Sequence, residues 1–279
     1  MAVSGALDHR DEAPARRLDL QRLYGANERL IVGGGTLACV LIAWELVARF
    51  GVLDPLFISA PSRVARAAYT LFAEGEIWPD LKVSATEFLL GYVLAAAIGI
   101  PLGLATGWYR RLSYVISPFV DTLNAVPRLT LMPLIVIWFG IGIWSKVVVV
   151  FLGAVLPVLI AAHAGVTTNE ARFIKVARSF GASQLKIFTS IILPGTVPFI
   201  FTGLKYGAGR ALLGVVVGEL YAATAGVGHM IGNAGNTFQT DVMFFGVLMF
   251  TAAGLLTVSA LNWCERRFET WRPKVGAAA

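Results

Sequence analysis

The chain has 279 residues, of which 57% are hydrophobic and 14% charged, and its mean hydropathy is +0.71. Soluble domains of this size are far less apolar, so the composition indicates an integral membrane protein. The net charge of +6 would suit a nucleic-acid partner, but the basic residues sort by membrane side, and we expect no nucleic-acid binding.

The first 29 residues are polar and carry five arginines. They contain no short apolar stretch followed by a small-residue cleavage site, which a signal peptide would have. We therefore expect a cytosolic tail at 1–29, a membrane domain at 30–263 and a second cytosolic tail at 264–279.

Six stretches are long and apolar enough to cross a bilayer, which takes about 20 residues of helix. We predict an all-α integral membrane protein with six transmembrane helices. Pro118, Pro127 and Pro133 interrupt the third stretch, and charged residues lie within the fifth. The predicted spans are 30–50, 85–107, 114–139, 144–166, 198–222 and 241–263.

The lysines and arginines indicate the orientation. With a cytosolic N-terminus, the inside segments hold fifteen basic residues and the outside segments three. This bias follows the positive-inside rule, so we expect both termini in the cytosol.

Between the first two spans, the sequence after Pro61-Ser62 repeats apolar residues at helical spacing. We predict a helix there that packs over the spans, in preference to one that loads substrate. Within the spans, glycines recur every fourth residue, a spacing that lets two helix backbones approach closely. These assembly glycines are Gly99, Gly103 and Gly107 in the second span and Gly203, Gly207, Gly214 and Gly218 in the fifth.

The sequence offers no catalytic constellation. It has no GxxxxGK[ST] phosphate loop, no HExxH or GxSxG, and no cluster of histidines and acids that would bind a metal. Cys39 and Cys264 have no CxxC spacing and are expected to be two buried, inert thiols. The glycine-rich GVGHMIG at 226–232 has no strand before it, so we expect a tight turn there. We predict no catalytic residue, no metal site and no cofactor bound by this chain.

Residues 169–194 are too polar to span and yet helical in pattern. Gly181 divides them into two short amphipathic helices, and Leu193-Pro194 is expected to close the second. Such a segment would lie on lipid headgroups or fill a groove on a partner protein. Its apolar side consists of Phe173, Val176, Ala177, Phe180, Leu185, Phe188 and Ile192.

The spacing within this segment resembles the cytoplasmic-loop signature of ABC importer permeases. That signature is an acid followed by two alanines, a glycine four positions after the second, and an Ile-x-Leu-Pro ending. Ala177, Gly181, Ile191, Leu193 and Pro194 match it. The wider sequence at 177–220, PLIVIWFGIG at 133–142 and FISAPSRV at 57–64 are similar to the nitrate, sulfonate, taurine and bicarbonate branch. The resemblance covers about 30–270.

Two positions depart from the family pattern. In register, the acid of the signature falls on Lys175 and its first alanine on Val176, while Glu170-Ala171 lies five residues too early. The charge at the position of the acid is therefore reversed, and a salt bridge of the family's acid is not carried over. The ATPase-coupling residues implied by the resemblance are Lys175, Val176, Ala177, Gly181, Ala182, Leu193 and Pro194.

The resemblance implies a type I (MetI-like) importer permease in the bacterial inner membrane, surrounded by lipid. Its coupling helix would lie in a cleft of a separate ATPase subunit, which binds ATP and Mg²⁺. An extracytoplasmic solute-binding protein would deliver the substrate, and two permease copies, expected to be a homodimer, would form one pathway. Closure of the ATPase subunits would switch the spans from inward-facing to outward-facing.

The substrate expected from the resemblance is a small anion such as an alkanesulfonate, taurine, nitrate or bicarbonate. A vitamin precursor such as a thiamine pyrimidine is the alternative within the family. An ion-coupled secondary transporter and a membrane enzyme are the alternatives outside it.

Polar residues within spans are the candidates for the translocation pathway. They are Asp121, Asn124, Arg128, Lys205, Arg210 and Glu219. Lys205 and Arg210 would attract an anion. The structural alternatives are that Arg128 pairs with Asp121, that Lys205 and Arg210 lie at the cytosolic interface, and that Glu219 neutralises one of them.

Overall fold

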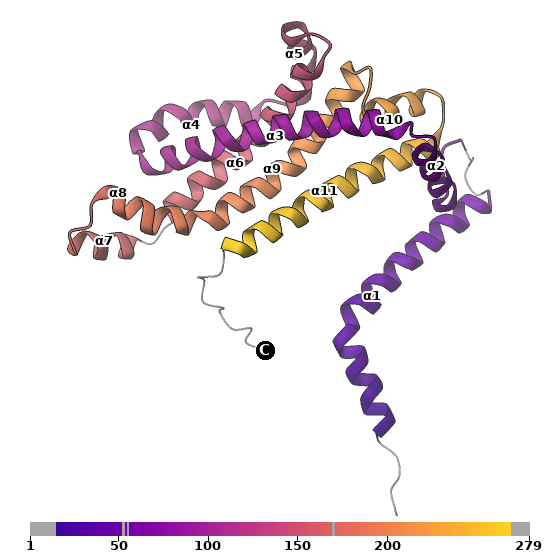
Figure 1. Ribbon diagram of the computed structural model, residues 1–279, viewed down its shortest axis with the longest axis horizontal. Helices are drawn as coiled ribbons and strands as arrows, with labels where there is room; N and C mark the ends of the chain where they lie inside the picture. The colour runs from indigo at the N-terminus through magenta and orange to yellow at the C-terminus, as the bar shows by residue number, and fades with distance from the viewer. Residues whose placement is uncertain (1–14, 52–53, 55, 169–170, 269–279) are drawn as a thin grey trace, which may run out of the picture. The chain divides into compact units, whose positions relative to one another are not determined.

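A computed structural model describes residues 15–51, 54, 56–168 and 171–268, and each regular element in these ranges is helical (Figure 1). The prediction of an all-α protein is confirmed. The elements are α1 (Ala15–Arg49), α2 (Pro61–Ala73), α3 (Ile77–Trp108), α4 (Arg110–Ala125), the 3₁₀ helix η1 (Arg128–Leu131), α5 (Met132–Phe139), α6 (Ile143–Thr168), α7 (Ala171–Ser179), α8 (Gln184–Ile187), the π-helix η2 (Phe188–Ile192), α9 (Leu193–Ala222), α10 (Val227–Asn236) and α11 (Thr240–Phe268).

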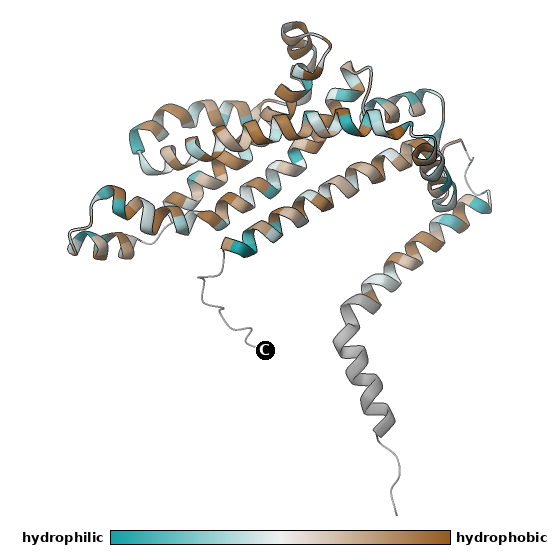
Figure 2. Cartoon of the chain, viewed as in Figure 1, coloured by the Kyte–Doolittle hydropathy of each residue, from teal (hydrophilic) through white to brown (hydrophobic). Residues whose placement is uncertain are grey.

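Five of the six predicted spans lie in single helices. Among the described residues, five helical stretches are long and apolar enough to cross a membrane: Val32–Arg49, Ile77–Trp108, Ile143–Thr168, Gln184–Ala222 and Thr240–Phe268. Figure 2 shows hydrophobic residues along α3, α6, α9 and α11, with a hydrophilic C-terminal end on α11. The polar end of α11 is the beginning of the predicted C-terminal tail, whose residues 269–279 lie outside the described ranges.

The predicted third span, 114–139, is not one helix. It consists of α4, η1 and α5, and the break falls at Val126, whose backbone is extended (φ −72°, ψ 126°). The cause is Pro127, because the ring of a proline disfavours helical geometry in the residue before it. Pro118 and Pro133 do not interrupt a helix. Pro133 lies in the first turn of α5, where a backbone N–H would have no carbonyl partner within the helix.

The core of the unit formed by residues 64–279 is α6, which packs along α3 on one side and α9 on the other. The predicted glycine surfaces make these contacts. A Cβ on Gly103 would lie 2.5 Å from the Leu159 carbonyl oxygen, and one on Gly214 would lie 3.1 Å from the Val150 Cα. The glycines thus bring both neighbouring backbones onto α6, as small residues do in membrane bundles.

The helix predicted after Pro61-Ser62 is α2. Val64 is buried, and the Phe72 ring makes edge-on contacts with Trp78 of α3 and Phe245 of α11, at centroid distances of 5.7 and 5.8 Å. The prediction of a helix packed on the spans is confirmed.

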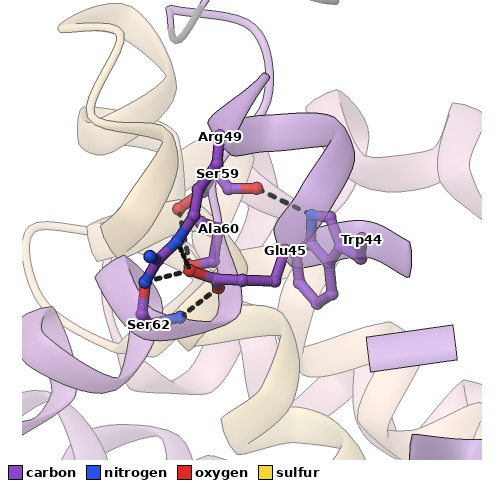
Figure 3. A network of polar contacts seen from close by, with 6 residues as sticks. All are labelled: Trp44, Glu45, Arg49, Ser59, Ala60 and Ser62. Atoms are coloured by element: carbon purple, nitrogen blue, oxygen red, sulfur yellow. Dashed lines mark hydrogen bonds and ion pairs between the residues drawn. The ribbon is translucent and has the colours of Figure 1, made fainter. Parts of the chain in front are cut away.

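The first 63 residues form a separate compact unit. Within it, the C-terminal end of α1 holds the following connection through a polar network (Figure 3). The Trp44 indole donates to the Ser59 carbonyl at 2.7 Å, and the Glu45 carboxylate accepts from the Ser62 N–H and hydroxyl at 3.0 and 2.7 Å. Arg49 pairs with the same carboxylate. Of the predicted N-terminal tail, residues 1–14 lie outside the described ranges and the rest belongs to α1.

Candidate functional site

The segment between α6 and α9 turns at Gly181, as predicted. Gly181 has a left-handed backbone (φ +72°), its N–H donates to the Arg178 carbonyl at 2.9 Å, and the Ala182 N–H donates to the Ala177 carbonyl at 3.0 Å. This pair of bonds is the Schellman motif, which ends a helix at a left-handed residue and satisfies its last carbonyls. The spacing from Ala177 to Gly181 is therefore the spacing of a helix C-cap.

The second short helix begins after Ser183, whose hydroxyl accepts from the Lys186 N–H at 3.3 Å as an N-cap. The expectation that Leu193-Pro194 closes this helix is wrong. The backbone stays helical through Ile192 and Leu193, and α9 follows directly. The helix widens to a π turn in η2, in which the Leu193 N–H donates to the Phe188 carbonyl five residues earlier. Pro194, at the beginning of α9, supplies no N–H to this turn.

One face of this segment is anchored to the bundle. Val166 of α6, Ile187 and Ile192 are buried together, and Ala177 and Ala182 pack against them. The Phe188 ring contacts Trp108 at the end of α3 at a centroid distance of 5.3 Å. The turn is thus packed directly against α3 and α6, and it continues into α9.

The opposite face is exposed and apolar. Phe180 is 86% exposed and Leu185 73%, and Phe173 and Val176 are also more than half exposed. Lys175, Arg178 and Lys186 of the same segment are also exposed. The apolar side predicted from the sequence therefore divides in two, with Ala177, Phe188 and Ile192 turned to the bundle and these four side chains turned away from it. We call Phe173, Val176, Phe180 and Leu185 the exposed coupling face.

A second feature is a cavity of about 390 Å³ beside the interruption between helices α4 and η1. Asn124 and Arg210 contribute its polar side chains. Arg210 lies where α9 packs tightly against α6, since a Cβ on Gly153 would lie 2.9 Å from the Arg210 carbonyl oxygen. The Arg210 backbone is thus fixed against α6. The remaining lining is Ala125, Val126, Pro127, Val149, Gly153, Leu213, Gly214 and Val217.

Residues 99–270 match the family described as "Binding-protein-dependent transport system inner membrane component". The chain belongs to this family of ABC importer permeases. It is therefore a multi-pass transport subunit, and ATP hydrolysis and solute capture belong to separate ATPase and solute-binding subunits.

Named relatives agree with this assignment over nearly the whole permease. The chain is 35% identical to the taurine transport system permease protein TauC of Escherichia coli (strain K12), over 86% of this chain and 90% of the relative. It is 30% identical to the putative aliphatic sulfonates transport permease protein SsuC of Bacillus subtilis (strain 168), over 97% and 96%. A solved chain of the MetNI methionine ABC transporter, 18% identical, aligns with a TM-score of 0.54 over 69% of this chain and 94% of the solved one, and shows the type I importer fold.

The structure places five of the six predicted pathway residues, and they do not all lie in one site. Asn124 and Arg210 line the cavity just described. Lys205 pairs with Glu265 of α11, with 2.5 Å between Nζ and Oε2. Asp121 lines a different, smaller cavity of about 160 Å³, which also holds His163. Glu219 is fully buried, and the side chain of Arg128 lies outside the described part of the permease.

Sequence reasoning missed the partners of Glu219. Ser84 and Glu87 of α3 and Lys146 of α6 are all buried near it. Each lies near the end of a predicted span, where polar residues are common, and only the packing of three helices brings them together. The available signal was the presence of charges within two apolar spans, since such residues in a membrane are rarely without a partner.

Proposed function

We propose that a pair of copies of this permease carries a small sulfonate, of the taurine or alkanesulfonate class, across the inner membrane. A solute-binding protein would deliver the sulfonate, and ATP and Mg²⁺ bound to two ATPase subunits would drive its passage. The cavity that contains Asn124 and Arg210 supports this substrate class, together with the names of the two relatives.

The chemistry of the two side chains suits a sulfonate. A guanidinium keeps its charge at all physiological pH values and presents several N–H donors in one plane, which match the oxygens of an oxyanion. The Asn124 amide adds a neutral donor. The other lining side chains are apolar, so they would contact the organic part of the substrate.

Substitution of Arg210 tests the substrate class. Hydrogen bonds to a charged group contribute about 1.5–3 kcal/mol, so Arg210→Gln should weaken the apparent affinity for taurine or an alkanesulfonate roughly 10- to 100-fold. The assay is uptake by proteoliposomes that contain the permease, the ATPase and the binding protein. Arg111→Gln is the matched control, because Arg111 is exposed, carries the same charge and does not line the cavity.

Unchanged sulfonate uptake by Arg210→Gln would contradict the assignment of this cavity. Uptake of a thiamine pyrimidine by the wild type, without uptake of sulfonates, would favour the vitamin-precursor alternative. In either case ATP-dependent transport of some solute would remain, as membership of the family requires.

We infer an orientation in which the turn at Gly181 lies in the cytosol, because the positive-inside bias favours it. The exposed coupling face would then meet the ATPase subunit. Apolar side chains that are more than half exposed on a water-facing turn indicate a protein partner. Lys175 lies at the edge of this face, so an acidic group on the ATPase would complement it.

A homodimer is supported by α4, none of whose described side chains is buried. Tyr114, Val115 and Phe119 are each at least 60% exposed, and Ile137 and Trp138 of α5 are also exposed. A second copy would cover this face and enclose the nearby cavity, and lipid would cover the remainder. The molar mass of the purified complex should correspond to two permease copies, and a mass with one copy would contradict this arrangement.

A further inference from the structure

Three charged side chains are buried together where α3, α6 and α9 meet. Glu87 and Glu219 have no exposed surface, and Lys146 is 5% exposed. The Lys146 Nζ lies 3.5 Å from Glu87 Oε1. Burial of charge within a membrane bundle is costly unless the charges are balanced and hydrogen-bonded. None of these three side chains lines the proposed sulfonate cavity, so substrate binding does not account for their burial.

Glu219 has a donor at each carboxylate oxygen. The Ser84 hydroxyl donates to Oε1 at 2.6 Å, and the Gly228 N–H donates to Oε2 at 2.6 Å. Ser84 in turn accepts from the Val227 N–H at 2.9 Å. Glu219 is therefore in the environment of an ionised carboxylate, and it connects the beginning of α10 to α3.

Gly226 and Gly228, at the beginning of α10, allow the Glu219 carboxylate to approach the backbone closely. Gly226 has a positive φ of +123°, and a Cβ on it would overlap the Glu219 carboxyl group. The Gly226 N–H donates to Asp80 Oδ1 at 2.7 Å, which fixes the same turn to α3 a second time. The prediction of a tight turn over the whole of GVGHMIG is wrong, because α10 begins at Val227 and only Gly226 lies before it. Two acids, Asp80 and Glu219, hold the beginning of α10, and of these only Glu219 is fully buried.

Glu87 is different, because neither of its oxygens accepts a hydrogen bond from the described residues. Glu87 follows Ser84 by three residues on α3, and Ser84 donates to Glu219, so Glu87 and Glu219 are buried in one cluster with Lys146. If both acids were ionised, this buried cluster would hold two negative charges and one lysine. A proton on Glu87 would remove the repulsion, and it would give the unpaired oxygen a partner as a donor.

We propose that Glu87 holds a proton and donates it to Glu219, so that Glu87, Glu219 and Lys146 form a charge-neutral clasp. The clasp fixes the turn between α9 and α10 to the ends of α3 and α6. Glu87 is the neutral donor, Glu219 the acceptor, and Lys146 the counter-ion. All three are positioning residues, since none of them lines the cavity that contains Arg210.

Two amide substitutions test this assignment. In Glu87→Gln, the amide NH₂ can replace the proposed O–H donor and the amide oxygen can still face Lys146, so transport and thermal stability should stay within about twofold and a few degrees of wild type. In Glu219→Gln, an NH₂ would face either the Ser84 hydroxyl or the Gly228 N–H. Transport should then fall at least tenfold, and the melting temperature should drop.

Infrared difference spectroscopy of the detergent-purified importer complex provides a readout that packing alone would not change. The wild type should show a protonated-carboxyl C=O band that shifts in D₂O and is absent in Glu87→Gln. The exposed Glu74→Gln is the control, and it should retain the band.

Absence of this band in the wild type would overturn the proposal, and so would a band that persists in Glu87→Gln. Equal damage from both amide substitutions, or greater damage from Glu87→Gln, would also overturn it. If neither variant assembles, the wild-type and Glu74→Gln spectra still decide whether a buried acid is protonated, and a missing band refutes the proposal.

Discussion

The turn at Gly181 allows backbone conformation to be separated from side-chain bulk. Its φ of +72° is left-handed, and no heavy atom lies within 4 Å of the position that a Cβ would take. A substitution therefore meets no neighbour within the permease, and its effect is conformational. A β-branched residue in this conformation costs about 2 kcal/mol, alanine about 1, and asparagine less, because asparagine adopts the left-handed region readily.

A cost of 2 kcal/mol corresponds to a roughly 30-fold shift away from the native turn. Since this turn would transmit ATPase closure, Gly181→Val should lower ATP-dependent uptake strongly, Gly181→Ala moderately and Gly181→Asn little. Membrane insertion should be unchanged in all three, because the anchored residues of α6 and η2 are not altered. The assay is uptake and ATP hydrolysis by the reconstituted importer, and hydrolysis without uptake is the expected sign of uncoupling.

Equal uptake by Gly181→Asn and Gly181→Val would refute this reasoning. If both were inactive, the turn would be sensitive to side-chain bulk against the ATPase and not to backbone conformation. If both were fully active, the Schellman turn would have no part in coupling.

Two other substitutions test the exposed coupling face and the helix contacts. Phe180→Ala should weaken binding of the ATPase subunit about 10- to 100-fold, measured as its retention on purification, because the Phe180 ring, 86% exposed in the permease, would no longer be buried in the partner. Tyr69→Ala is the control, because it removes an exposed ring from α2, and it should not weaken binding. Gly103→Ala should destabilise the permease by about 1–3 kcal/mol in a thermal unfolding assay, since the new Cβ would meet the Leu159 carbonyl oxygen. Gly209→Ala is the control and should not destabilise it, because no heavy atom lies within 4 Å of the Cβ position. Equal melting temperatures of the two variants would contradict the proposed packing.

The features that could be predicted from the sequence are those in which local spacing has a direct structural cause. A glycine every fourth residue places all of them on one helix face, and Gly103 and Gly214 both meet α6. Gly181 could be recognised because a left-handed helix cap favours glycine. The substrate class relied on resemblance, since the residues alone indicated only an anion.

The features that could not be predicted depend on contacts between distant segments. Ser84 and Glu219 are 135 residues apart, and no sequence pattern relates them. Pro194 was misjudged for a different reason. A proline has no N–H, so it often marks the place where a helix ends. Here a π turn accommodates the missing donor and the helix continues.

The central helix α6 connects the three features of the permease. Near one end, Lys146 belongs to the buried clasp, Gly153 contacts the backbone of Arg210, and near the other end Val166 packs beneath the turn at Gly181. From Lys146 to Val166 the helix rises about 30 Å, which is the thickness of the hydrocarbon core. Because glycine contacts pack α6 closely against α9 along this length, the two helices would move as one body. A force on the coupling turn would then reach the cavity by displacement of rigid helices, without any change of conformation between them.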